Sequence, residues 1–497
     1  MYLKSTCGHL RPKDAVHLYL RSRRSGRRKG IPSFNGEINS ETLYLYPYMS
    51  SITKDLNVFQ VATMAVFLVI GAIGIILFAT NKAGVGSTSY KSVVWGVLPK
   101  SVIDASLDVY SVQGIDPNFT YEEFPEEGFD QTILQAIAEG RGPDAIVFPD
   151  TMYYGQLHKL VTIPSETMTA REYAERYIDA GQLFAIQGGV KALPLVTDPL
   201  VMYYNKDMFT SAGILTPPKT WKELADITSK LTRKTDDGII DRSAVALGEY
   251  GNISYAKRIL YTLLTQAGVR VSFYDPGVNE YATGLTRNNQ AELEQGQTSS
   301  AERTTSVLRY YTDFANPLRP NYTWNRSFTS SRDAFLGQSL AVYFGPGSEV
   351  QYILSRNPNL NFAIAPVPQE DPDFNKATHG KTYALGFLVT SQHIKDAYPD
   401  VTKFFMSDTM IQGLADATNM APAKRLLLAN AKPAKESADL AVVYESAVYA
   451  RTWMDPEVVS TDTIFKTLIE AITSGKQSLS EAVQDTADRI DRLYATH

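Results

Sequence analysis

The chain has 497 residues and a formal net charge of −5, with 44% hydrophobic and 20% charged residues. This composition is typical of a globular protein of two or three domains and excludes wholesale disorder. The single cysteine, Cys7, excludes an intramolecular disulfide, and no CxxC or HExxH pattern is present, so the common zinc sites are excluded as well. The sequence also lacks a Walker A loop, a GxSxG elbow and a GxGxxG fingerprint. We therefore expect neither a cofactor nor a metal.

The first predicted element is an apolar segment near the N-terminus. No charged residue lies between Asp55 and Lys82. As a helix, residues 58–79 would span roughly 33 Å, which is enough for the apolar core of a bilayer. The run has no polar face, which argues against a buried helix of a soluble domain. It is longer than the apolar region of a signal peptide and no A-x-A site follows it, so we predict an uncleaved transmembrane signal anchor over residues 58–80.

The charges on either side of this segment predict its orientation. Residues 1–57 carry a net charge of +6, whereas residues 82–497 carry −11. Because basic flanks stay in the cytoplasm, we predict a cytoplasmic tail over 1–57 and a large extracytoplasmic domain, joined to the anchor by a tether over 81–92. This topology explains the basic tail without nucleic-acid binding. Translation from Met49 instead of Met1 is an open alternative.

Strands and helices are predicted to alternate after the tether. Residues 93–99 form a strand pattern, and an apolar stripe from Asp130 to Gly140 indicates a helix that Asp130 can cap. The short run 144–148 is typical of a buried parallel strand. Together these segments predict an α/β unit.

The stretch 192–204 combines a strand pattern with two prolines. Pro194 and Pro199 argue against a regular central strand and suggest a crossover between two sheets. The helix that follows is predicted to begin with a capping box of Thr220 and Glu223.

Three further elements are predicted in the C-terminal half. Residues 340–347 and 383–389 are strand candidates. The last helix is predicted to begin with a second capping box, made by Ser478 and Glu481.

Several stretches together resemble the bacterial extracellular solute-binding proteins of family 1, the group that contains maltose-binding protein and serves ABC importers. They occur in the family's order and cover most of residues 90–497. The stretches are GPDAIVFPD (142–150), PLVTDPLVMYYNKDMFTSAGILTPPKTW (194–221), VLRYYTDFANP with YTWNRS (307–327), AFLGQSLAVYFGPGS (334–348) and NMAPAKR (419–425).

The resemblance implies an α/β fold of two lobes joined by crossing strands, the type II periplasmic-binding-protein-like clamshell that closes over a ligand. Lobe 1 would contain residues 90–196 and 380–421. Lobe 2 would contain residues 200–367 and 425–497. The proline-containing stretch then lies at the first crossing.

Two carboxylates are candidate ligand contacts. Carboxylates in such proteins bind sugar hydroxyls at the cleft. Asp198 aligns with an acidic cleft residue of maltose-binding protein, and its alternative role is a charge on the hinge surface. Asp150 follows a strand at its carboxyl end, where α/β sheets bind ligands, and its alternative role is a helix N-cap.

Aromatic side chains would supply the stacking surfaces for a sugar. Trp324, Trp453 and Tyr153 are the candidates, with core packing as the alternative for each. Gly347 stands where maltose-binding protein has a tryptophan after its Gly-Pro, which removes one platform and puts a maltose-like ligand in doubt. Tyr343 or Tyr352 could compensate.

The resemblance implies a receptor rather than an enzyme. It would bind a small solute, most readily a sugar or oligosaccharide, and deliver it to the permease subunits of an ABC importer while anchored in the bilayer through residues 58–80. Two alternatives remain open. One is a membrane-tethered hydrolase that uses two carboxylates about 5–10 Å apart, drawn from Asp144, Asp150 and Asp198. The other is a sensor or adhesion module that keeps the clamshell without transport.

Overall fold

A computed structural model describes residues 90–112, 117–275, 280–287, 298–431 and 437–496. The chain divides into two units, Met1–Ser87 and Thr88–His497, and all described residues belong to the second unit. The predicted tail, the transmembrane segment 58–80 and most of the tether lie outside the described residues and stay predictions. In the ranges that are described, no helix is both long and apolar enough to cross a bilayer.

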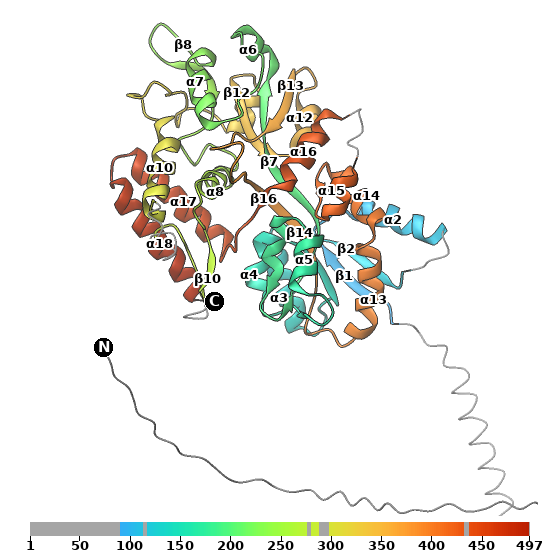
Figure 1. The fold of residues 1–497 in the computed structure, drawn as a ribbon. Coiled ribbons are helices and arrows are strands. Elements are labelled where there is room, and N and C mark those ends of the chain that lie inside the picture. The colour runs from blue at the N-terminus through green and yellow to red at the C-terminus, as the bar shows by residue number, and fades with distance from the viewer. Residues whose placement is uncertain (1–89, 113–116, 276–279, 288–297, 432–436, 497) are drawn as a thin grey trace, which may run out of the picture. The chain divides into compact units, whose positions relative to one another are not determined.

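A mixed sheet of eleven strands, counted within the described residues, forms the centre of the unit (Figure 1). Its main path contains, in spatial order, β2 (Phe119–Glu123), β1 (Ser92–Gly96), β3 (Ala145–Pro149), β14 (Thr378–Phe387), β7 (Leu193–Asn205), β12 (Leu340–Pro346), β9 (Ile240–Val245) and β8 (Arg233–Lys234). Alongside this path, β7 also pairs with β13 (Phe362–Pro366) and β15 (Ala421–Pro422), and β14 pairs with β16 (Ala450–Arg451). Strand β1 is parallel to β2 and β3, as predicted for the first α/β unit.

Strand β7 joins two parts of this sheet. Its residues up to Pro199 pair with β14, and those from Leu200 onward pair with β12 and β13. We call β2, β1 and β3, with β14 and the first part of β7, the first sheet region. The second sheet region contains β12, β9, β8 and β13 with the rest of β7.

The prolines argued against a regular central strand, and β7 is irregular next to Pro194 and changes partners after Pro199, but it does not end at either proline. Pro194 and Pro199 lie inside a continuous strand of 13 residues. The irregularity is confined to a register shift between Tyr383 and Ala384 of β14. A proline lacks the N–H that a sheet requires, and a local bulge accommodates this loss without ending the strand.

Helices surround the first sheet region (Figure 1). They are α2 (Lys100–Val112), α3 (Phe129–Ala138), α4 (Tyr153–Gln156), α5 (Ala170–Arg176), α13 (Ile394–Phe405), α14 (Asp408–Thr418), α15 (Arg425–Asn430) and the 3₁₀ turns η1 (Asp150–Met152) and η2 (Asp179–Phe184). A small sheet of β4 (Ile163–Pro164), β6 (Gly189–Val190) and β5 (Ala185–Ile186) accompanies them. The helix predicted from Asp130 begins one residue earlier. Gly128, at φ 79°, is its N-cap, so Asp130 does not cap it and lies in its first turn.

The second sheet region carries a larger set of helices, in which α10, α17 and α18 pack together (Figure 1). The set contains α6 (Lys206–Ser211), α7 (Trp221–Leu231), α8 (Ala256–Gln266), α10 (Ser300–Asp313), α11 (Ser331–Leu336), α12 (Glu349–Arg356), α16 (Ala438–Val448), α17 (Val458–Thr473) and α18 (Leu479–Ala495), with a hairpin of β10 (Phe273–Asp275) and β11 (Glu280–Ala282). Both predicted capping boxes are confirmed, that of Thr220 at α7 and that of Ser478 at α18.

Candidate functional site

The two longest strands in the described part of the chain bring polar residues together where β7 changes partners. Lys381 of β14 lies opposite Asp198 of β7, and Thr382 lies opposite Thr197. The two threonine hydroxyl oxygens are 3.0 Å apart. Because directly opposed residues of an antiparallel pair are neighbours on one face, the register places a cation beside an anion inside the protein.

Asp198 is buried and fully hydrogen-bonded. Its side chain is 4% exposed. Ser348, which follows β12, donates its backbone N–H to Oδ1 at 3.1 Å and its hydroxyl to Oδ2 at 2.6 Å. Burial raises the pKa of the Asp198 carboxyl, and the bonds from Ser348 and the charges of Arg258 and Lys381 oppose that rise. The residue therefore ties β7 to the turn before α12, and its predicted ligand contact stays a prediction.

Asp150 is buried and poorly hydrogen-bonded. It begins η1 directly after β3 and is 1% exposed, and among the described residues neither carboxylate oxygen has a well-formed hydrogen bond. Burial raises its pKa to about 6. Weak hydrogen bonds from the Thr452 side chain and the Thr382 N–H, together with the charges of Lys381 and Arg258, oppose the rise. The N-cap of η1 is Pro149 rather than Asp150, so the alternative role as an N-cap is wrong.

Two further polar residues on β14 were missed by the sequence reasoning. Lys381 is 9% exposed and forms an ion pair with Glu126. Its Nζ atom lies 5.3 Å from the ring centre of Tyr383. His379 is 5% exposed, and its Nδ1 atom has no hydrogen-bond partner. Burial and the charges of Arg258 and lysine neighbours hold the pKa of His379 well below its usual range, so its ring is neutral.

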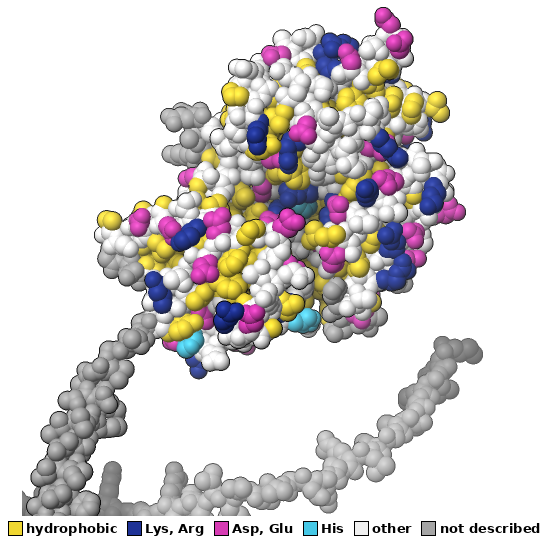
Figure 2. Space-filling model, turned by 180° about the vertical axis from the view of Figure 1, so that it is seen from behind, with side chains coloured by type: hydrophobic (Ala, Val, Ile, Leu, Met, Phe, Trp, Pro, Cys, Tyr) yellow, Lys and Arg dark blue, Asp and Glu magenta, His cyan; other side chains and the backbone are white. Residues whose placement is uncertain are grey.

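A small cavity lies between the crossing strands and α8. It measures about 40 Å³, and residues that line it include Thr151, Arg258, His379 and Trp453. Figure 2 shows a hollow in this face of the molecule with basic and histidine side chains deep inside it. The lining combines residues next to β3, on β14 and on α8, so both sheet regions contribute to it.

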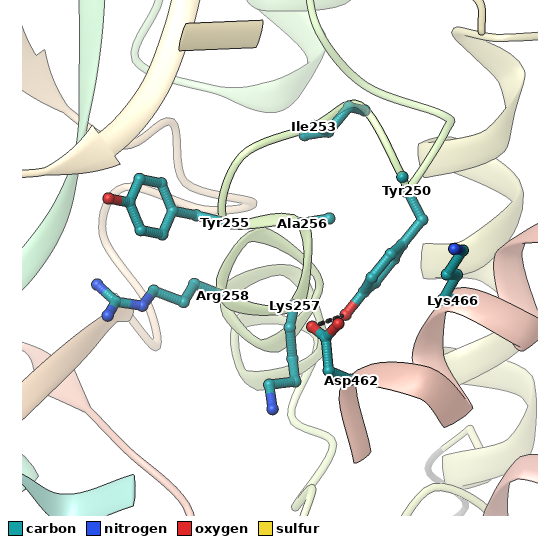
Figure 3. A pocket seen from close by; sticks show the side chains of 9 residues that line it. Tyr250, Ile253, Tyr255, Ala256, Lys257, Arg258, Asp462 and Lys466 are labelled. Carbon is teal, nitrogen blue, oxygen red and sulfur yellow. Dashed lines mark hydrogen bonds between the residues drawn. The ribbon is translucent and has the colours of Figure 1, made fainter. Parts of the chain in front are cut away.

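A larger cavity adjoins the small one and measures about 370 Å³. The two share Lys257 and Arg258 of α8 as lining residues. Figure 3 shows the first turn of α8 nearly end-on, with Tyr255 and Arg258 on one side of it and Lys466 on the other. Basic and aromatic side chains thus dominate this part of the site.

Of the carboxylates proposed for a hydrolase, Asp144 does not form a suitable pair with Asp150. Asp144 precedes β3 and Asp150 follows it, so six residues of extended chain, about 20 Å, separate them. This distance is too long for two carboxylates that flank one glycosidic bond. Asp144 is also engaged by donors from Tyr90, Val93 and Ser391. Within the described residues, no group of three His, Cys, Asp or Glu side chains could hold a metal ion.

Comparison with known proteins identifies the family. The family model described as bacterial extracellular solute-binding protein matches residues 111–442, about two thirds of the chain. The chain belongs to this family. The resemblance stated from the sequence is thereby confirmed, and the matched relatives of this solute-binding protein are binding proteins of ABC transporters rather than enzymes.

Curated relatives match the solute-binding protein over different lengths. The maltodextrin-binding protein MdxE of Bacillus subtilis is 23% identical over 364 residues, which is 71% of this chain and 77% of that protein. The sn-glycerol-3-phosphate-binding periplasmic protein UgpB of Salmonella typhimurium is 49% identical over 49 residues, 10% of this chain and 11% of that protein.

Solved structures of binding proteins have the same fold. A cyclic α-maltosyl-1,6-maltose binding protein from Arthrobacter globiformis has a TM-score of 0.64 at 16% identity, over 82% of this chain and 99% of that chain. A cyclo/maltodextrin-binding protein in complex with maltotetraose has a TM-score of 0.63 at 15% identity, over 82% and 98% of the two chains. The solute-binding protein therefore has the predicted periplasmic-binding-protein-like α/β fold.

The predicted aromatic platforms lie in different surroundings. Tyr153 and Trp324 are fully buried, and the Trp324 ring stacks on Phe328 at 4.4 Å and donates its Nε1–H to Asn252. Trp453 is 6% exposed and lines the small cavity. Of these three residues, only Trp453 lines the small cavity. We therefore keep Trp453 as a candidate ligand contact and assign Tyr153 and Trp324 to the core.

Gly347 is enclosed by α16. A Cβ atom at Gly347 would lie 2.6 Å from Cγ2 of Val443, and the Gly347 carbonyl accepts a hydrogen bond from Asn419. An aromatic side chain has no room there. Of the two tyrosines named as compensation, Tyr343 is 1% exposed and Tyr352 is 38% exposed.

Proposed function

We propose that the chain is a membrane-anchored extracytoplasmic receptor that binds a carbohydrate between two lobes and delivers it to an ABC importer. The observation that carries the proposal is Asp150, a buried carboxylate that has no well-formed hydrogen bond among the described residues and that precedes Thr151, a lining residue of a cavity to which both sheet regions contribute. Buried polar groups are nearly always bonded, and an unbonded group next to a cavity indicates a missing polar ligand. A sugar hydroxyl is a suitable donor for it.

The proposed lobes follow the two sheet regions. Lobe 1 contains 90–196 and 380–421, and lobe 2 contains 200–367 and 425–497. The change of partners at Pro199 and Leu200 of β7 supports this division. Closure of the lobes would bring Arg258 of α8 toward Asp150, and a ligand that contacts both lobes would shift the population toward the closed state.

A carbohydrate is the solute class best supported for this receptor. The maltodextrin- and maltotetraose-binding relatives support it. Within the site, Asp150 offers carboxylate oxygens without well-formed hydrogen bonds among the described residues, and Trp453 offers an aromatic ring that lines the cavity. This combination of a few polar groups with an aromatic face is typical of sugar sites.

The anchor and the importer complete the proposed receptor. Residues 58–80 would span the bilayer with residues 1–57 in the cytoplasm, and the tether would keep the receptor at high effective concentration near the permease. Protease treatment of intact cells tests this topology. We expect cleavage within residues 88–497 and protection of the basic tail, and the reverse pattern would contradict the proposed orientation.

A ligand screen on the full-length chain tests the receptor function. The protein is purified in a detergent without a sugar headgroup and heated with maltotriose, mannobiose, glycerol phosphate and other saccharides or polyols. A ligand at 100 times its Kd adds about 2.7 kcal/mol to the stability of the folded state, so binding raises the Tm measurably. The Trp453→Ala variant should lose this shift, whereas Phe374→Ala, at an exposed position outside both cavities, should keep it. If no saccharide or polyol stabilises the protein, the proposed function is wrong.

A further inference from the structure

The larger cavity has an unusual distribution of charge. Among the residues that line it are Tyr250, Tyr255, Lys257, Arg258, Asp462 and Lys466. Three of them are basic and one is acidic. The question is which of these charges are already neutralised by neighbours and which remain available to a ligand.

The first turn of α8 faces this cavity with unbonded backbone donors. Its N-cap, Tyr255, adopts the left-handed conformation at φ 61°, and no side chain accepts a hydrogen bond at the cap. The backbone N–H groups of Lys257 and Arg258 have no acceptor in the described residues. The N-terminal end of a helix carries partial positive charge, and such unbonded N–H groups bind oxyanions.

The conformation of Tyr255 is held by its own contacts. Its hydroxyl donates to Glu349 at 2.8 Å and accepts a hydrogen bond from Arg332 at 2.7 Å. A positive φ is unfavourable for an aromatic residue and persists where the surroundings fix it. The fixed ring then supports Arg258, whose guanidinium carbon lies 4.9 Å from the ring centre.

Two of the three basic side chains form no ion pair among the described residues, although the charge of Arg258 also opposes the rise that burial causes in the pKa of the Asp150 and Asp198 carboxyls. Lys257 donates to Asp455, Thr461 and a backbone carbonyl, each at 3.0 Å. In contrast, Lys466 forms no ion pair in the described part of the chain, and the buried Nη1 atom of Arg258 has no hydrogen-bond partner there. The one carboxylate of the cavity, Asp462, accepts a hydrogen bond from Tyr250 at 2.6 Å.

The adjoining small cavity, which shares Arg258 with the larger one, contains a further polar atom without a partner. His379 is 95% buried and lines only the small cavity, and its Nδ1 atom has no hydrogen-bond partner among the described residues. A buried polar atom without a partner costs stability unless something outside the chain bonds to it. Arg258 therefore lines two adjoining cavities, and both cavities are lined by residues with polar atoms that have no hydrogen-bond partner among the described residues.

We propose that the ligand of this receptor is an acidic saccharide, whose oxyanion binds in front of the first turn of α8 between Arg258 and Lys466. The inference rests on the proposed function and narrows its solute class from carbohydrates in general to anionic carbohydrates. Arg258 and the backbone N–H groups of α8 bind the oxyanion, and Lys466 supplies a second positive charge from α17. A carboxylate of a uronic acid and a phosphate of a sugar phosphate share this chemistry.

Direct binding to the full-length chain tests the inference. The protein is prepared in a phosphate-free buffer and a detergent without a sugar headgroup, and calorimetry measures the Kd of trigalacturonate, glucose 6-phosphate, maltotriose and sodium phosphate. We expect trigalacturonate or glucose 6-phosphate to bind at least about 10-fold tighter than maltotriose, because hydrogen bonds to a charged group contribute about 1.5–3 kcal/mol. Which of the two binds identifies the oxyanion. Raising NaCl from about 0.05 to 0.5 M should weaken that binding, since salt screens a partly exposed charge pair.

Three variants localise the effect. Arg258→Gln should weaken binding of the acidic saccharide about 10- to 100-fold and Lys466→Gln about 3- to 10-fold. Arg309→Gln removes the same charge from an exposed position of α10 outside the cavity and should change the Kd less than about 2-fold. The unliganded Tm of each variant is measured first. Because Lys466 is exposed and the salt dependence needs no variant, both readouts remain decisive even if Arg258→Gln unfolds the protein.

The other outcomes separate the inference from the proposed function. If maltotriose binds as tightly as the acidic saccharides and neither NaCl nor Arg258→Gln affects it, the acidic ligand is wrong and the receptor function stands. If sodium phosphate binds and no saccharide does, the ligand is not a saccharide, and both proposals are wrong. If no probe binds, both are wrong as well.

Discussion

The crossing strands around Asp198 and the first turn of α8 around Arg258 both carry charged side chains, but these charges are bonded differently. On the strands, Asp198 has two donors from Ser348, and Lys381 has an ion pair with Glu126. On α8, Nη1 of Arg258 has no hydrogen-bond partner among the described residues. Bonded buried groups stabilise the fold, whereas unbonded ones lower its stability until a ligand bonds to them.

Asp150 belongs with Arg258 in this comparison, although it lies close to the strands. Among the described residues neither of its oxygens has a well-formed hydrogen bond, whereas both oxygens of Asp198 accept one. The difference between two buried aspartates of the same site therefore separates a structural role from a ligand-binding role. The variants proposed next change either a hydrogen-bonded buried group or one without a partner.

The largest effect is expected on the bonded side. Asp198→Ala should lower the free energy of unfolding by about 3 kcal/mol, because two hydrogen bonds to a charged group are lost and the Ser348 N–H remains without its acceptor. Urea unfolding of the fragment 88–497 measures this. Ser348→Ala removes only the hydroxyl bond and should cost about 1 kcal/mol. If Asp198→Ala costs less than Ser348→Ala, Asp198 is not the structural tie described here.

On the unbonded side, Asp150→Asn should stabilise the protein in a pH-dependent way. The folded-state pKa of Asp150 is raised to about 6 by burial, from about 3.9 in the unfolded chain. The contribution of Asp150 to the free energy of unfolding is therefore fully present below about pH 4 and is lost as the pH rises through about 6. Since each pKa unit corresponds to about 1.4 kcal/mol, the loss is about 2–3 kcal/mol.

The measurement compares unfolding free energies at pH 4 and pH 7. The asparagine variant lacks the ionisation, so its stability relative to the unmodified protein should rise by about 2–3 kcal/mol between these two pH values. Asp108→Asn, at an exposed position of α2, should show no such rise. If the two variants show the same pH dependence, the pKa of Asp150 is not raised by burial, and this prediction is wrong.

The sequence predicted the local part of the fold well. Capping boxes at Thr220 and Ser478 depend on residues three positions apart, so neighbouring residues determine them. The bonding of Asp198 could not be predicted this way, because its partner Ser348 is 150 residues away in the chain. Its location at a crossing was implied by the resemblance, but its bonds follow from tertiary structure.

The residues on β14 show a second limit. The strand was predicted over residues 383–389, and the polar residues THGKT before it were not assigned to it. It begins at Thr378 instead, so His379 and Lys381 lie inside a buried strand. Burial in the folded protein overrides the local preference. A strand is recognised in a sequence by the spacing of its apolar residues, and this spacing is lost where buried positions carry polar residues. Arg258 was missed for a related reason, since its place beside the cavities depends on how α8 packs.

Gly347 belongs to the bonded region around Asp198. It precedes Ser348, and its N–H donates to the Pro199 carbonyl at 2.9 Å. In Gly347→Ala the new methyl group would meet Val443, so the free energy of unfolding should fall by about 1–2 kcal/mol. Val443→Ala in the same chain opens that space, and the double variant should cost less than the sum of the two single variants. Additive costs would contradict the proposed clash.

The smallest effect is expected at Lys466, which lines the larger cavity from α17. It is exposed and has no ion pair in the described residues, so Lys466→Gln should change the free energy of unfolding by less than about 0.5 kcal/mol. Lys257 lines the same cavity but donates three hydrogen bonds, one of them to the buried Asp455. Lys257→Gln should therefore cost several times as much in the same urea titration. Equal costs for the two variants would show that Lys466 is already engaged within the protein, and its charge would then not be available to a ligand.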